Sequence, residues 1–174
     1  MKKVISVLLA VLCLALVVTT TVYAATSFVE GGVTVVAGAG TTVDASYTGD
    51  TGSSDVNTLV GKATVTVADL EGAGITGFPS SSSYDVTVVG NFFDVTGTPA
   101  AFTVESDKIV AGVQVAVAHY QTAAPAGWEF KAATSVDTTN HTATFSLTSG
   151  SPVILVVYKA KTTPASGVVN TATK

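Results

Sequence analysis

The chain has 174 residues, a formal net charge of −4 and an apolar share of 47%. It contains no arginine, and its eight lysines do not cluster along the sequence. Nucleic-acid binding needs a basic surface that displaces counterions from phosphates, and anionic membranes attract polybasic segments. The sequence offers neither, so we expect no nucleic-acid partner.

The first 24 residues have the three parts of a secretory signal peptide. Lys2 and Lys3 precede an apolar run at 4–18, and small residues lead to Ala24. This run of 15 residues is shorter than the roughly 20 that a bilayer core requires. We therefore predict a leader cleaved after Ala24 or Ala25, and an extracellular or cell-surface mature chain of net charge −6 with no membrane span.

The single cysteine, Cys13, lies inside the apolar run of the leader. A lipoprotein signal would place the cysteine at the end of that run, whereas Cys13 is followed by more leucine and valine. The predicted mature chain therefore has no thiol and depends on its apolar core, which a domain of about 150 residues can form because it buries nearly 70% of its unfolded surface. An exported chain without cysteine is typical of a Gram-positive surface protein.

Short runs of β-branched and aromatic residues, separated by glycine, proline and serine, predict strands. The predicted strands are 33–36, 42–47, 63–67, 84–89, 92–95, 113–120, 128–131, 141–147 and 152–158. The last is a continuous apolar run, which indicates a central strand covered on both faces. Residues 52–55 are predicted to be a loop, and only 68–74 suggests a short helical turn.

This pattern predicts an all-β chain: an antiparallel β-sandwich with immunoglobulin-like architecture and little or no helix after the signal peptide. We expect a signal peptide at 1–24 and a β-sandwich domain at 25–158. Residues 159–174 are a flexible Thr/Pro/Gly linker or a truncated wall-anchor region. The edge strands cannot be assigned from the sequence, so the oligomeric or fibre state stays open.

His119 and His141 are the only histidines, and both lie at predicted strand ends. Nucleophilic catalysis needs a hydroxyl or thiol beside a base that a third group orients, and no G-x-S-x-G motif occurs. Two histidines without a cysteine do not make a zinc site. We therefore expect packed or hydrogen-bonded imidazoles, no enzymatic activity and no cofactor.

The acidic residues show no catalytic pairing. No two glutamates have a spacing that brings them together as the carboxylate pair of a glycosidase; these are Glu30, Glu71, Glu105 and Glu129. Glu129, which lies between two aromatic residues, is expected to face solvent. Asp50 and Asp55 flank a Gly/Ser loop, a weak calcium pattern that does not match an EF-hand, and we predict no metal site.

Trp128, the only tryptophan, is either a core residue or an exposed platform for stacking a sugar. Trp128 and Tyr120 are the candidate ligand contacts. A carbohydrate-binding module is accordingly one alternative function, and a small extracellular hydrolase is a weaker one. Residues 140–142 match the N-glycosylation pattern on a predicted turn, which matters only in a glycosylating host.

A strand ending in His-Tyr at 113–120 is followed by a Trp-Glu strand at Trp128, a Thr-rich strand at 142–145 and a Ser-Pro-Val strand at 151–157. This succession resembles a C-terminal β-rich module of exported surface proteins from Gram-positive, largely gut-dwelling bacteria of the Firmicutes type. Residues 92–95 resemble its start, and the similarity covers 91–158. The resemblance implies a surface location and a β fold, and it implies no enzymatic activity.

Residues 163–167 are similar to a sortase sorting motif, because Pro164 and Gly167 match it while Thr163 and Ser166 depart from it. A sorting signal continues into an apolar helix and a basic tail, so the alternatives are a fragment of a longer surface protein and an ordinary linker.

Two covalent modifications known in surface sandwiches are not favoured. The last strand is faintly similar to that of autoproteolytic sandwich domains, but Gly150 precedes Ser151 and no histidine is adjacent. An internal isopeptide bond would need a buried lysine near an Asn or Asp, and Lys62, Lys108 and Lys131 are expected to be exposed. The predicted function is a secreted or cell-wall-associated surface module, structural or adhesive, whose partner is an unknown extracellular protein or glycan.

Overall fold

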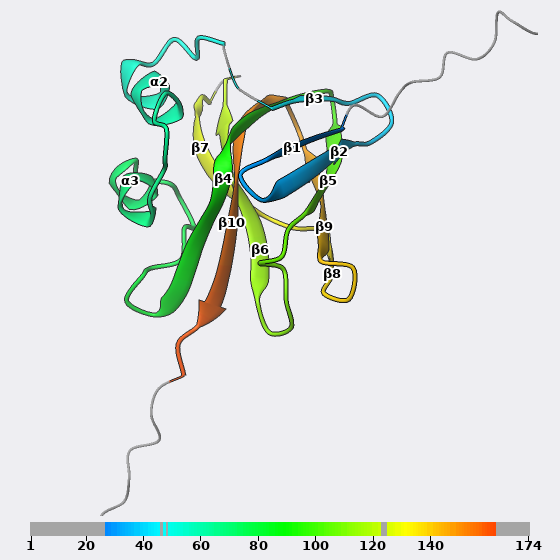
Figure 1. Cartoon of the computed structure of the whole chain (residues 1–174). Helices are drawn as coiled ribbons and strands as arrows, with labels where there is room; N and C mark the ends of the chain where they lie inside the picture. The colour runs from blue at the N-terminus through cyan, green and yellow to red at the C-terminus, as the bar shows by residue number, and fades with distance from the viewer. Residues whose placement is uncertain (1–26, 46, 48, 123–124, 163–174) are drawn as a thin grey trace, which may run out of the picture.

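Three layers make up the part of the chain that the computed structural model describes, residues 27–45, 47, 49–122 and 125–162 (Figure 1). These residues form ten strands in two sheets, and two short helices cover one of the sheets. The predicted signal peptide with Cys13 and its cleavage site, and the sorting-like residues Pro164 and Gly167, lie outside the described residues.

The first sheet, which we call sheet A, contains five antiparallel strands in the order β1-β2-β5-β9-β8. Their bounds are β1 Ser27–Glu30, β2 Val33–Ala37, β5 Ala100–Glu105, β9 Thr142–Leu147 and β8 Ser135–Asp137. In β9 the side chains of Ala143, Phe145 and Leu147 are buried and alternate with threonine and serine. Only one face of sheet A is therefore buried, as the period of two in its sequence predicts.

The second sheet, sheet B, has the order β3-β4-β10-β6-β7, also antiparallel. Its strands are β3 Thr42–Asp44, β4 Tyr84–Thr96, β10 Ser151–Ala160, β6 Gln114–Gln121 and β7 Gly127–Ala132. In β10, the central strand, residues 152–157 are all buried. The predicted central strand with cover on both faces is thus confirmed.

The core between the sheets is built from alternating inward side chains of both. Phe102 stacks on Phe145 with ring centroids 5.3 Å apart, and Phe93 meets Phe102 edge-on at 5.8 Å. Valine and leucine side chains of β2, β6 and β10 surround these rings. The antiparallel β-sandwich predicted from the sequence is confirmed, whereas its immunoglobulin-like identity stays a prediction.

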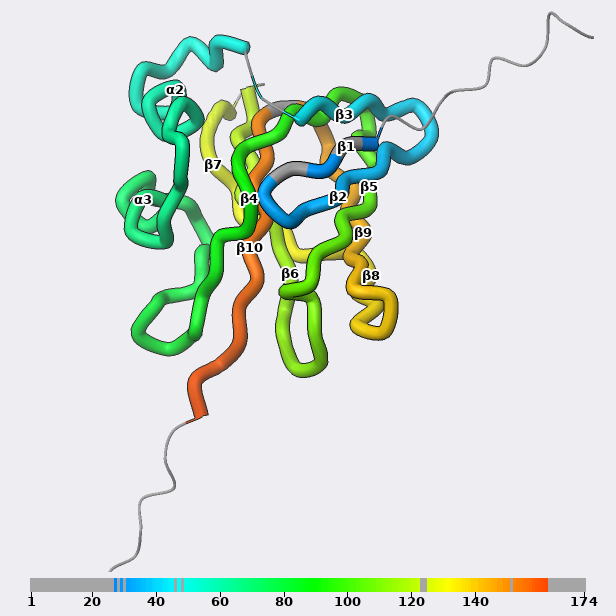
Figure 2. The backbone as a smooth tube through the Cα atoms, viewed as in Figure 1, coloured from blue at the N-terminus to red at the C-terminus, as the bar shows by residue number. Residues whose placement is uncertain are grey.

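The two helices, α2 Ser54–Val60 and α3 Val67–Gly72, pack on the outer face of sheet B (Figure 2). Leu59 and Leu70 from the helices join Phe92, Ile154 and Val156 from the sheet in a second apolar cluster. This layer is also why β6, predicted as a strand with one valine face, buries its alanines on the opposite face.

Two local predictions between the strands are wrong. Residues 63–67 alternate as a strand does, but 63–66 belong to the connection between the helices, where Val65 is buried and Thr66 is the N-cap of α3, and Val67 begins that helix. Residues 52–55 form a loop only up to Ser53, because α2 begins at Ser54. Short-range capping bonds and burial under the helix layer outweigh the β-propensity of threonine and valine here.

The two predicted strand runs 84–89 and 92–95 belong to one strand, although Gly90 and Asn91 lie between them. β4 runs through both residues, and its pairing with β10 shifts register between Val153 and Leu155. Gly90 has φ of 72°, a left-handed conformation open to glycine. The bulge adds an even number of residues to β4, so the alternation of its side chains continues. Phe92 therefore faces the helices, as Val88 does, and Phe93 faces the sandwich core, as Val89 does.

The sheet edges, which the sequence leaves unassigned, are short or covered. β3 and β8 have three residues each and β1 has four. The longer edge strand β7 has a parallel bridge between Thr76 and Glu129 on its open side. Short or covered edges disfavour pairing with another chain.

Candidate ligand groove beside Trp128

A groove of about 460 Å³ lies between the two helices and the start of β7. Val56, Leu59 and Ala73 supply apolar wall, Asp55 and Lys62 supply charge, and Trp128 lines it from the sheet. Ligand sites are commonly concave and largely apolar, with a few polar groups that orient the ligand. The groove is concave, but its lining is more polar than that of such a site.

Trp128 is half-buried and held by two neighbouring rings. Phe92 lies 5.6 Å from its ring centroid, and Tyr120 meets it edge-on at 5.3 Å. No hydrogen bond of the described residues involves the indole N–H, and it is not among their buried unpartnered atoms. Trp128 therefore packs on the second cluster, as a core residue does, and it also lines the groove.

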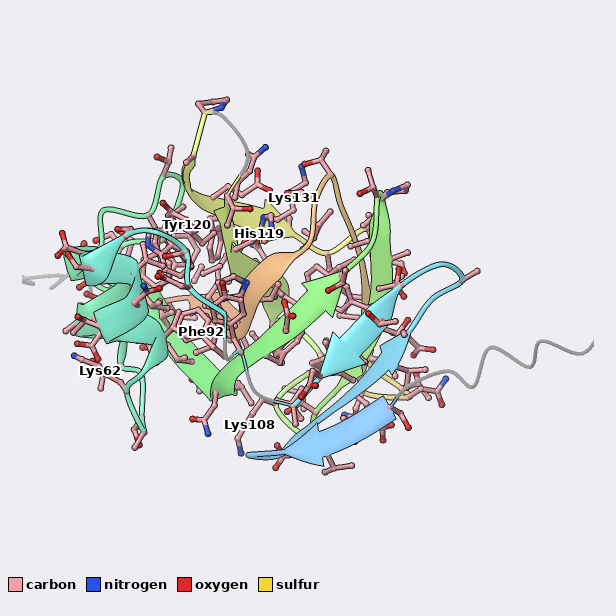
Figure 3. All side chains as sticks on the ribbon, turned by 90° about the horizontal axis from the view of Figure 1, so that it is seen from above. Lys62, Phe92, Lys108, His119, Tyr120 and Lys131 are labelled. Carbon is pink, nitrogen blue, oxygen red and sulfur yellow. The ribbon has the colours of Figure 1, made fainter. Side chains whose placement is uncertain are left out.

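Tyr120, the other predicted ligand contact, is 8% exposed and does not line the groove. Figure 3 shows Tyr120 and Phe92 within the dense side chains around sheet B, and Lys62 on the outside of the helix layer. The structure thus brings Tyr120 and Trp128 into contact, with Tyr120 supporting the indole rather than reaching the groove.

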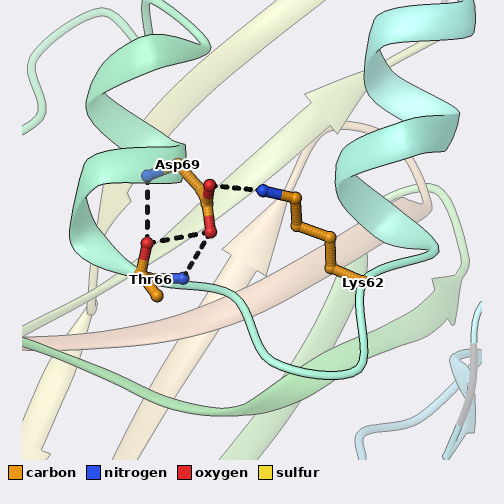
Figure 4. Close-up of polar contacts among 3 residues, drawn as sticks. All are labelled: Lys62, Thr66 and Asp69. Carbon is orange, nitrogen blue, oxygen red and sulfur yellow. Dashed lines mark hydrogen bonds and ion pairs between the residues drawn. The ribbon is translucent and has the colours of Figure 1, made fainter.

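Lys62 and Asp69 join the two helices across the groove (Figure 4). Lys62 Nζ lies 2.5 Å from Asp69 Oδ1, and Asp69 Oδ2 accepts hydrogen bonds from the backbone N–H and the hydroxyl of Thr66. Thr66 Oγ1 in return accepts from the Asp69 N–H, which completes a capping box at the start of α3. The ammonium group of Lys62, followed by the Thr66 bonds, lowers the pKa of Asp69 to about 2.

These contacts decide which polar groups in the groove remain for a ligand. Both carboxylate oxygens of Asp69 are engaged, so this residue fixes the helices. The side chain of Lys62 is 43% exposed and has donors beyond the one that Asp69 accepts. Asp55 accepts one long bond of 3.4 Å from its neighbour Ser54. The lining residues with polar side-chain groups left for a ligand are thus Ser53, Asp55, Lys62 and Trp128. Of these, the sequence singled out Trp128 as a ligand contact.

The sequence predicts that Glu129 faces solvent, but in the structure this side chain contacts a buried histidine. Its Oε1 lies 2.9 Å from Nδ1 of His119, which is fully buried, while the Glu129 side chain is 33% exposed. The pairing of β6 with β7 places His119 opposite Glu129. Because successive side chains of a strand alternate, Glu129 lies on the sandwich side, and Trp128 and Phe130 pack under the helices.

The other histidine, His141, lies in the turn before β9 with φ of 56°. Its Nδ1 is 2.8 Å from the backbone oxygen of Ile109. The preceding Asn140 is exposed and donates through Nδ2 to Asp137. Within the described part of the chain, neither imidazole hydrogen-bonds a hydroxyl or a thiol, and both histidines are packed or hydrogen-bonded, as predicted. His119, however, lies inside β6, which continues to Gln121, rather than at its end.

Asp50, one half of the weak calcium pattern, has a structural contact before α2. Its Oδ1 accepts from the Gly52 N–H at 2.8 Å and from Nδ2 of Asn57. These hydrogen bonds lower the pKa of Asp50, and the bond from the Gly52 backbone has the larger effect. Among the residues that the structure describes, no three His, Cys, Asp or Glu side chains gather as metal ligands would.

A second hollow, of about 510 Å³, lies near the ends of β3 and β4. Asp94 lines it and is the cross-strand partner of Asp44. The pKa of Asp94 is raised, mainly because the side chain is partly buried and to a smaller extent because the charge of Asp44 is near. This acidic pair was not singled out by the sequence, because the pairing of β3 with β4 is what brings the two residues together.

Of the three lysines predicted to be exposed, Lys62 and Lys108 are exposed and Lys131 is half-buried in β7. Lys108 pairs with its neighbour Asp107 at 3.2 Å. The prediction for Lys131 is therefore wrong, since this side chain lies on the sandwich side of an edge strand, next to the β6 strand that it pairs with.

The fold and the groove together define a two-sheet antiparallel β-sandwich with a helical layer and a ligand-sized groove at that layer. No protein-family model, curated protein or solved structure matches the chain. None of the helices in the described ranges has the length and apolar character needed to cross a membrane.

Proposed function

We propose that this chain is a secreted or cell-wall-associated surface module, structural or adhesive, whose partner is an extracellular protein or glycan. The first 24 residues support export, because they have the composition of a cleavable leader. The region that resembles Gram-positive surface modules, 91–158, supports the surface role.

The observation that carries the proposal is where that region lies in the fold. It supplies β5 and β9 at the centre of sheet A, and β6 with most of β10 in sheet B. Its large inward residues, such as Phe102, Phe145 and Leu155, are buried. The residues that carry the resemblance are therefore those that build the sandwich, as expected for a module of the same architecture.

The location is tested by expressing the chain in a Gram-positive host and separating medium, wall and cytoplasm. We expect the mature protein outside the membrane, accessible to protease on intact cells, with an N-terminus at Ala25 or Thr26. A matched control with Leu9→Arg and Leu12→Arg interrupts the apolar run and should stay inside. Wild-type protein retained in the cytoplasm with its leader intact would refute the proposal.

A carbohydrate-binding role is the second candidate, and the groove beside Trp128 is the observation that favours it. An indole ring with an unpaired N–H, a lysine with spare donors and an aspartate give the stacking surface and the hydrogen bonds that hydroxyl-rich ligands need.

The carbohydrate role is tested on a glycan array. Trp128→Phe keeps an aromatic ring against Phe92 but removes the N–H, and Lys62→Ala removes a donor; each should weaken any glycan signal. Lys108→Ala is the matched control, because Lys108 is exposed and does not line the groove. A folded wild-type protein without signal for any glycan would retire this role and leave a protein partner.

A further inference from the structure

His119 is a titratable side chain buried inside the sandwich. Its exposed fraction is 0%, and in the strand register it faces Glu129 of β7 on one side and Val153 of β10 on the other. The inward side chains of β2, β5 and β9 in the facing sheet are valine, alanine, phenylalanine and leucine. The imidazole therefore has apolar surroundings on every side except that of β7 and the turn before β10.

Only one nitrogen of this imidazole is satisfied. Nδ1 lies 2.9 Å from Glu129 Oε1, whereas Nε2 is buried without a hydrogen-bond partner. Ser149 Oγ, in the turn before β10, is the other buried side-chain polar atom without a partner among the described residues. Protonation of the ring would thus add a charged N–H in a buried position, where the backbone of Gly150 favours it but the burial of the charge is costly.

The charged groups around His119 act in both directions. Glu129 favours the imidazolium form, as does the backbone of Gly150, while Lys131, also on β7, disfavours it. Burial is the largest effect and lowers the pKa of His119. The neutral ring is thus the form that fits the closed structure.

β7 is the element whose movement would hydrate His119. It is an edge strand of sheet B, so it pairs with one strand only, β6. On its other side its backbone has a single bridge, to Thr76. Edge elements with few partners open at lower free energy than central strands do. Glu129 and Trp128 are neighbours on this strand, so its opening would change the surroundings of the indole.

We propose that the His119–Glu129 pair makes the β6–β7 edge an acid-sensitive element, which opens when the buried imidazole takes up a proton and displaces Trp128 with it. The inference does not depend on the proposed surface function. Because the folded-state pKa lies below that of a hydrated histidine, about 6.5, the closed form is fully stable above that pH. As the pH falls from there toward the folded-state pKa, the closed form loses stability. The equilibrium constant for opening then rises by up to about tenfold per pH unit.

The wild-type protein allows a direct test, because it has two histidines and one tryptophan. NMR titration of the two imidazoles should show His119 with a midpoint below about 6.5, and the fluorescence of Trp128 should change over the same pH range. A His119 midpoint at or above that value, or Trp128 fluorescence that is unchanged across the titration, would overturn the proposal.

Variants separate His119 from general effects of acid. His119→Gln should abolish the change in Trp128 fluorescence between pH 7.5 and pH 5, and the matched control His141→Gln should keep it. Glu129→Gln removes the carboxylate that favours the imidazolium form, so the His119 midpoint should move to lower pH. An equal pH response in wild type and His119→Gln would contradict the proposal, and if His119→Gln does not fold, the wild-type titration decides.

Discussion

The two sheets share one core, but their outer faces differ in what covers them. On sheet A, β9 alternates buried Ala143 and Phe145 with half-buried Thr144 and exposed Ser146. On sheet B, Val156 faces outward in β10 and is fully buried under the helix layer. The comparison shows that a period of two indicates a bare outer face, whereas a continuous apolar strand indicates a further layer.

The shared core should have the largest effect on stability. Phe145 is 0% exposed and stacks on Phe102, so Phe145→Ala should lower the free energy of unfolding by about 3–5 kcal/mol. Urea denaturation measures the loss. Ser146→Ala, one residue along and on the bare face, should change it by less than about 0.5 kcal/mol. Equal costs for both changes would mean that the inward and outward faces of β9 are misassigned.

The helix layer should contribute less. Leu70 is also 0% exposed, at the contact of α3 with sheet B, and Leu70→Ala should cost about 2–3 kcal/mol, near the lower end for such a truncation. The cost is limited because α3 can detach while the sandwich stays folded. If the loss in urea matches that of Phe145→Ala, the helix layer and the sandwich unfold as one unit.

A reciprocal exchange sharpens the difference between the outer faces. Val156→Thr places a hydroxyl under the helices and should cost about 1–2 kcal/mol. Thr144→Val removes a hydroxyl that hydrogen-bonds Thr103 Oγ1 at 3.2 Å on the bare face, and its effect should stay within about 0.5 kcal/mol because water replaces the bond. Thermal or urea unfolding of both variants provides the measurement; a larger cost for Thr144→Val would reverse the assignment of the faces.

The smallest effect is expected for the ion pair between the helices. Lys62→Ala should change stability only slightly, because a half-exposed pair is screened by water, but it should raise the pKa of Asp69 from about 2 toward its ordinary value. The stabilising contribution of the Asp69 carboxylate is complete above that ordinary value of 3.8 and is lost as the pH falls through about 2. NMR titration of Asp69 tests this. An unchanged pKa would mean that Thr66 alone accounts for it, and Lys108→Ala serves as the control.

The sequence predicts the sandwich well, because alternation in β9 and the apolar run of β10 follow directly from burial. It misses α2, and it predicts a strand at 63–67, because these short segments are determined by the capping bonds of Thr66 and by contact with sheet B. No local pattern shows such contacts.

The candidate site is predictable in part. Trp128 stands out as the only tryptophan, but the roles of Lys62 and Asp55 depend on how the helices fold onto β7. The contact of His119 with Glu129 depends on the register of β6 and β7. A ten-residue separation in sequence does not reveal that the two side chains meet, so the sequence places Glu129 in solvent.

Apolar packing holds all three layers together, with the helices docked on sheet B. Hydrogen exchange of the backbone amides in the purified chain is the decisive measurement of this packing. We expect β6 and β10 to exchange only through global unfolding, and α2 and α3 to exchange faster than these strands but much more slowly than an unstructured peptide. Amides at 54–72 that exchange at the rate of an unstructured peptide would contradict it.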